Sequence, residues 1–181
     1  MPKKILHFIF FCMAVAAIVA GLKLMNWVPS AFQEGFLREY ASIEDVKARL
    51  KITHVYAPTY YPQCLEWPPV KITAQTRPHT AVVMEFVQKG LSDVCLVISQ
   101  TQIPHPPPTE RIRFDTVKEA VRYNFKGREM LLEVGICSDG APCSRLSWEE
   151  SGYRITAASK STPVDLVKIG ESMIPAQDGR M

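Results

Sequence analysis

Cysteine is the residue type with the clearest potential chemistry in this 181-residue chain, which contains five of them. Cys137 and Cys143 enclose Ser-Asp-Gly-Ala-Pro, a turn composition between two strand-like runs, and this spacing predicts a disulfide across the mouth of a loop. Cys64 and Cys95 remain as a second predicted pair, although spacing alone does not determine connectivity. These four residues form an even set, as expected in an oxidising compartment, whereas Cys12 lies apart in an apolar run.

Metal binding and catalysis are not indicated by the other polar residues. His54, His79 and His105 show no zinc-like spacing with any cysteine. The sequence lacks Cys-x-x-Cys, Cys-x-x-Cys-His and Gly-x-Ser-x-Gly, the patterns of thiol exchange, covalent haem attachment and a serine nucleophile. We therefore expect no metal, no cofactor and no enzymatic activity.

The charge distribution argues against a nucleic-acid partner. The chain has 21 Lys and Arg and 18 Asp and Glu, and its formal net charge is +3. Three of the basic residues, Lys3, Lys4 and Lys23, precede position 30, so the remainder carries 18 charges of each sign. A neutral remainder has no reason to form the basic groove that DNA or RNA requires, or to bind anionic lipid by charge.

Two segments rich in proline are candidates for a contact surface. In residues 55–78 prolines alternate with aromatic residues, which predicts extended chain and turns because proline removes an amide donor and restricts φ. The second segment, residues 104–108, is a rigid loop that holds His105. Such segments serve as packing or as binding surfaces, and rigid aromatic residues offer contact area at a low ordering cost. We predict that both segments bind a protein partner through Tyr60, Tyr61, Trp67, Pro68, Pro69 and His105.

The elements that would position these residues are mostly strands. Hairpin-type dipeptides, such as Lys126-Gly127 and Ser151-Gly152, join strand-like runs into a meander. A helix over residues 163–173 should cover one face of the sheet, with Trp148 packed beneath it. Residues 31–50 have helical periodicity, which predicts a short juxtamembrane helix to about Tyr40 and a second helix over residues 42–51. The expected class is α+β, with strands over residues 71–76, 81–88, 94–102, 120–125, 129–136, 145–149 and 153–158.

The N-terminus predicts a membrane anchor. Lys3 and Lys4 precede an uncharged run over residues 5–22, which as a helix would measure about 27 Å, close to the thickness of the bilayer core. Lys23 and Trp27 mark the far interface. Two lysines and the α-amino group precede the run and only Lys23 directly follows it, so the N-terminus is expected in the cytoplasm; a cleaved signal peptide is the alternative. The predicted product is a single-pass protein of the inner (cytoplasmic) membrane. Its parts are an anchor over residues 1–28, a juxtamembrane helical segment over residues 29–53 and an extracytoplasmic α+β domain over residues 54–181.

The two ends of the exported part carry a resemblance to a known family. Leu-Ser-Trp-Glu-Glu-Ser-Gly-Tyr at residues 146–153, together with Pro163, Leu166, Ile169, Glu171 and Ser172, resembles the end of a bacterial extracytoplasmic family of unknown function. Pro58, Tyr61 and Pro62 are similar to its opening Pro-x-Tyr-x-Pro segment. Family members often follow a single membrane span, sometimes as the outer half of anti-sigma-factor-like proteins. The resemblance implies an extracytoplasmic address but brings no catalytic residues, and Gly170 stands where the family has Ala.

The function expected from these features is binding rather than chemistry. The chain is predicted to be a non-enzymatic, membrane-anchored periplasmic binding or sensing domain that acts through a protein partner. Only residues 1–4 would remain in the cytoplasm, so a sensor of this design needs a partner to carry its signal inward. The alternatives are a structural accessory subunit of a larger envelope complex and a lipid or lipoprotein carrier.

Overall fold

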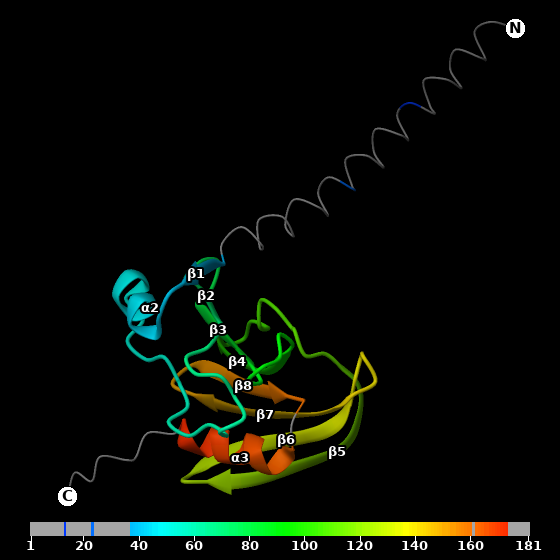
Figure 1. The fold of residues 1–181 in the computed structure, drawn as a ribbon. Helices are drawn as coiled ribbons and strands as arrows, with labels where there is room; N and C mark the ends of the chain where they lie inside the picture. Colours follow the sequence, from blue (N-terminus) through cyan, green and yellow to red (C-terminus); the bar gives the residue numbers. More distant parts are fainter. Residues whose placement is uncertain (1–12, 14–22, 24–36, 161, 174–181) are drawn as a thin grey trace, which may run out of the picture. The chain divides into compact units, whose positions relative to one another are not determined.

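The structure is a computed structural model that describes residues 13, 23, 37–160 and 162–173. The chain divides into two compact units, Met1–Leu37 and Arg38–Met181, and the strands and helices described below belong to the second (Figure 1). In chain order they are β1 (Arg38–Tyr40), α2 (Ile43–Leu50), β2 (Lys71–Gln75), β3 (Ala81–Val87), β4 (Val94–Gln102), β5 (Phe114–Phe125), β6 (Arg128–Cys137), β7 (Pro142–Glu150), β8 (Tyr153–Ser159) and α3 (Pro163–Ser172).

All eight strands form one antiparallel sheet in the order β1-β2-β3-β4-β8-β7-β6-β5. The strands of the predicted meander are therefore present, but their order differs from a simple meander. Two four-stranded meanders meet where β4 pairs with β8, and residues 103–113 carry the chain from β4 to the far edge, where β5 begins. The rigid proline loop predicted at residues 104–108 lies within this crossover.

The predicted α+β class is wrong, because the described chain is mainly β. Its two helices contain eight and ten residues, against eight strands in the sheet. Arg38–Tyr40, expected as the end of a helix, is strand β1 and pairs with β2 through Glu39 opposite Thr73. Pairing with a neighbouring strand thus overrides the local helical periodicity. The second predicted helix is present as α2, and Ser42 caps it: its hydroxyl accepts a 3.1 Å hydrogen bond from the Asp45 amide.

The predicted membrane anchor lies almost entirely outside the described residues. Of residues 1–28, the structure describes only residues 13 and 23, and the juxtamembrane segment is described from residue 37 onward. Within the described part of the chain, no helix is long and apolar enough to cross a membrane.

One face of the sheet carries the main core, beneath α3. Leu166 and Ile169 of α3 are buried, and the helix lies closest to β7 and β8. Gly170 allows this close approach, since a Cβ there would meet the Leu146 side chain at 2.3 Å. Trp148, predicted to be a core residue, is buried in this cluster with 2% of its surface exposed.

The opposite face carries a smaller core and is otherwise open. Ile112 from the crossover packs with Val83, Val97 and Ala158, and the Cys137–Cys143 disulfide belongs to the same cluster. The crossover therefore covers only part of this face. The remainder forms the groove described below.

Candidate functional site

The proline-rich segment that follows α2 is held at two points, one on α3 and one on the sheet. Near its start, the Tyr60 amide donates a 3.1 Å hydrogen bond to the Ser172 hydroxyl, and the Thr59 hydroxyl donates to the Ser172 carbonyl at 3.0 Å. Farther along, the Glu66 amide donates to the Val87 carbonyl at 2.9 Å. These bonds attach the segment to the end of α3 and to β3. Tyr60 and Glu66 are thus both fixed, and the aromatic residues that lie between them or directly after Glu66 are carried on a supported backbone.

Three of these aromatic residues, Tyr60, Tyr61 and Trp67, are exposed and are called the aromatic patch here. The rings of Tyr61 and Trp67 stack with centroids 4.7 Å apart and planes 6° from parallel. Trp67 in turn lies 6.0 Å from the ring of Phe86, which belongs to the main core. Tyr61 is 36% exposed and Trp67 40%, whereas Phe86 is 1% exposed. The stack therefore extends outward from the core, with Pro68 and the half-buried Pro69 directly after Trp67 in the chain.

His105, predicted to belong to the same contact surface, lies elsewhere. Its ring stacks on His79 at 4.3 Å, with the planes 9° apart, which joins the crossover to the β2–β3 turn. This turn precedes Ala81 at the start of β3, whereas Trp67 packs on Phe86 near the end of the strand. The two proline-rich segments therefore lie at opposite ends of β3. Burial lowers the pKa of His79, and the neighbouring His105 lowers it further.

The cysteines divide into one disulfide and two free thiols among the described residues. The predicted Cys137–Cys143 disulfide is confirmed, with Cα atoms 5.7 Å apart. The second predicted disulfide is not formed in the structure: Cys64 is an exposed free thiol and Cys95 a half-buried one. The Cys64 carbonyl accepts a hydrogen bond from the Lys89 amide, just after the end of β3. Cys95 belongs to β4, the strand that pairs with β3. Burial, followed by the nearby Cys64, raises the pKa of the Cys95 thiol.

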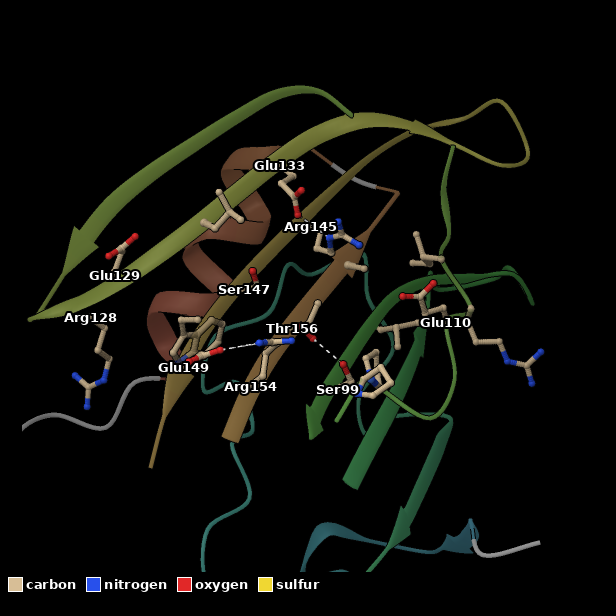
Figure 2. Close-up of a pocket in the computed structure, with 18 of the residues that line it drawn as sticks. Ser99, Glu110, Arg128, Glu129, Glu133, Arg145, Ser147, Glu149, Arg154 and Thr156 are labelled. Carbon is tan, nitrogen blue, oxygen red and sulfur yellow. Dashed lines mark hydrogen bonds and ion pairs between the residues drawn. The ribbon is translucent and has the colours of Figure 1, made fainter. Parts of the chain in front are cut away.

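A groove of about 880 Å³ with a mixed polar and apolar lining lies on the open face of the sheet, over β6, β7, β8 and β4 (Figure 2). Its floor is a row of three hydroxyl residues on adjacent strands: Ser147 is opposite Thr156, and Thr156 is opposite Ser99. Residues 106–112 of the crossover form one wall. This row depends on the β4–β8 pairing between distant parts of the chain. Sequence reasoning missed it because it did not predict that pairing.

Ion pairs border the hydroxyl row on both sides. On one side Arg145 Nε lies 2.8 Å from a Glu133 oxygen, and the Arg145 guanidinium also lies over the Phe114 ring at 4.9 Å. On the other side Arg154 Nη2 lies 2.8 Å from Glu149, as the dashed line in Figure 2 marks. Three more lining arginines are paired in the same way: Arg111 with Glu85, Arg122 with Glu129 and Arg128 with Glu150. The groove thus presents fixed charges of both signs.

Over residues 37–160 and 162–173, no three His, Cys, Asp or Glu side chains are grouped so that they could hold a metal ion. The chain matches no protein-family model, no curated protein and no solved structure. The resemblance of residues 146–153 and of the segment around Tyr61 to an extracytoplasmic family stays a prediction.

Proposed function

We propose that the second unit is an extracytoplasmic domain that acts by binding a protein partner through the aromatic patch. The observation that carries this proposal is the Tyr61–Trp67 stack, in which each residue keeps more than a third of its surface exposed. Exposed aromatic residues that lie together are typical of protein–protein contact sites, in which Tyr and Trp supply a large share of the binding energy.

The support beneath the patch strengthens this proposal. Trp67 is packed on the buried Phe86, and the backbone amide of Tyr60 donates a hydrogen bond to the Ser172 hydroxyl. Pro68 restricts the backbone directly after Trp67. Side chains that are already ordered lose little conformational freedom on binding, so more of their contact energy contributes to affinity.

The proposed extracytoplasmic location rests on the Cys137–Cys143 disulfide, because structural disulfides persist mainly in oxidising compartments. Both sulfur-bearing residues are buried, as expected of a structural rather than a catalytic bridge. Fractionation tests this location: an extracytoplasmic domain should be cleaved by protease added outside intact spheroplasts. Protection until the cells are lysed would contradict it.

A pair of matched variants tests the patch. Trp67→Ala should reduce recovery of the partner in affinity purification at least tenfold while leaving most of the protein folded. Val164→Ala, which removes an exposed apolar side chain from α3, should leave recovery unchanged. Equal recovery with both variants, at matched melting temperatures, would show that the patch is only an outer part of the core.

A further inference from the structure

We propose that the groove on the open face is a second binding site, which takes short zwitterionic peptides: ligands with both an ammonium and a carboxylate group. The site is separate from the aromatic patch. Trp67 packs on Phe86, which belongs to the core beneath α3, whereas the groove lies on the other face of the sheet. A substitution can therefore abolish binding at one site and leave binding at the other unchanged.

The floor of the groove suits a peptide backbone. Ser147, Thr156 and Ser99 stand in one row across three adjacent strands, which are about 4.8 Å apart. A hydroxyl group both donates and accepts hydrogen bonds, and a peptide presents amides and carbonyls in alternation. Ser147 and Thr156 are half-buried, so they are partly withdrawn from water but still accessible from the groove. Ser147 and Thr156 therefore offer partners to either kind of backbone group, whereas the hydroxyl of the buried Ser99 already donates to the Thr156 carbonyl at 3.5 Å.

The ion pairs on either side of the row favour a ligand that carries charges of both signs. Arg145 and Glu133 lie on one side of the row, and Arg154 and Glu149 on the other. A phosphate or polyanion near either arginine would also approach the glutamate paired with it, and a polycation would meet the arginine. A ligand with a separate ammonium and carboxylate can place each group beside its opposite charge. This complementarity favours a zwitterion over an ion of one sign.

Arg145 is already oriented for such a contact. Its Nε donates to Glu133, and the Phe114 ring supports its face. The two Nη groups carry further N–H donors in a rigid plane, which matches the geometry of a carboxylate. The pair is largely shielded from solvent, with 32% of the Arg145 side chain and 16% of the Glu133 side chain exposed. Its field is therefore screened less than that of an exposed pair.

Other ligand classes fit the groove less well. Sugars commonly stack on an exposed aromatic ring. Trp148 adjoins the groove but is only 2% exposed, so its ring is not accessible for such stacking. An apolar ligand would have to cover the charged pairs and remove their water, which is costly without compensation. The volume of about 880 Å³ lies within the range of about 300 to 1,000 Å³ typical of small-ligand sites. A short peptide is therefore compatible with the groove in both size and polarity.

The experiment compares two forms of one probe by isothermal titration calorimetry on the full chain. Tetra-alanine with free termini should bind, whereas N-acetyl tetra-alanine amide, which lacks both charges, should bind at least tenfold more weakly. In NMR spectra the free peptide should shift the backbone amides of Ser99, Ser147 and Thr156. No binding at millimolar concentration, equal binding of the two forms, or shifts confined to other residues would overturn the proposal.

Variants then separate the groove from the patch and from folding. Ser147→Ala with Thr156→Val removes two floor hydroxyls with little change in shape, and should weaken tetra-alanine binding at least fivefold at an unchanged melting temperature. Trp67→Ala should leave this binding unchanged, even if it abolishes partner recovery. Inorganic phosphate serves as the other control. Phosphate binding equal to that of the free peptide would show an anion site and contradict the zwitterionic assignment.

Discussion

The hydroxyl of Ser172, in the last turn of α3, accepts a 3.1 Å hydrogen bond from the backbone amide of Tyr60 and donates a 2.7 Å bond to the Ile169 carbonyl. Residues 112 positions apart in the chain are thereby joined directly. The bond connects α3 to the first residue of the aromatic patch. The position of the patch therefore depends on how α3 sits on the sheet.

Ser172→Ala should loosen the patch without unfolding the domain. The substitution removes an acceptor from the Tyr60 amide, and because this site is exposed to water the expected loss of stability is about 1 kcal/mol or less. Hydrogen exchange at the Tyr60 amide should become faster, and partner recovery should fall. An unchanged exchange rate would mean that the bond does not hold the segment.

Gly170→Ala should destabilise the domain although alanine is the better helix former. The new Cβ would meet the buried Leu146 side chain at 2.3 Å, and overpacking of this kind costs about 1 to 3 kcal/mol. Urea unfolding measures the change. In a Leu146→Ala background the same substitution should become neutral or stabilising. If Gly170→Ala lowers the free energy of unfolding by the same amount in both backgrounds, the contact with Leu146 is not the cause.

The Cys137–Cys143 bridge should contribute about 2 to 3 kcal/mol by restricting the unfolded chain. The double variant Cys137→Ser with Cys143→Ser should lower the free energy of unfolding by about that amount. Cys64→Ser, at an exposed free thiol, is the matched control and should have no effect. Mass spectrometry of non-reduced peptides should find residues 137 and 143 linked in the native protein. Two free thiols there would contradict the account.

The stacked histidines predict a loss of stability in acid. Burial and then His105 lower the pKa of His79 in the folded protein, so the unfolded chain binds more protons below its ordinary pKa of 6.5. Stability is therefore fully present above pH 6.5 and falls as the pH drops through the lowered pKa. His79→Gln should reduce this dependence in urea unfolding at pH 7.5 and pH 5.5. If the stability of the variant falls by the same amount between the two pH values, groups other than His79 cause the acid sensitivity.

Local features of the fold were predictable because local chemistry determines them. The Lys126-Gly127 dipeptide forms the tight turn expected between β5 and β6, with φ of 49° and 80°, values that favour glycine at the second position. Helix α3 begins at the predicted Pro163, capped by Thr162. The Cys137–Cys143 bridge closes a short loop whose ends are brought together by the turn itself.

Features that depend on long-range pairing were not predictable in the same way. β1 forms because Arg38–Tyr40 meets β2 more than 30 residues later, and no local pattern at Tyr40 signals this. The hydroxyl row of the groove needs the register of Ser99 against Thr156, which follows from the β4–β8 pairing. Tyr61 and Trp67 were predicted as contact residues, but their stacking was not. The sequence did not show that this pair and His105 lie at opposite ends of β3.

Site-specific photo-crosslinking tests the central claim, partner binding through the aromatic patch, most directly. A photoreactive phenylalanine analogue at position 60 should form one dominant crosslinked adduct in cells, and Trp67→Ala should abolish it. The same analogue at position 164, on the exposed side of α3, should not form that adduct. An adduct of equal yield from both positions, or none from position 60 in a folded protein, would contradict the account.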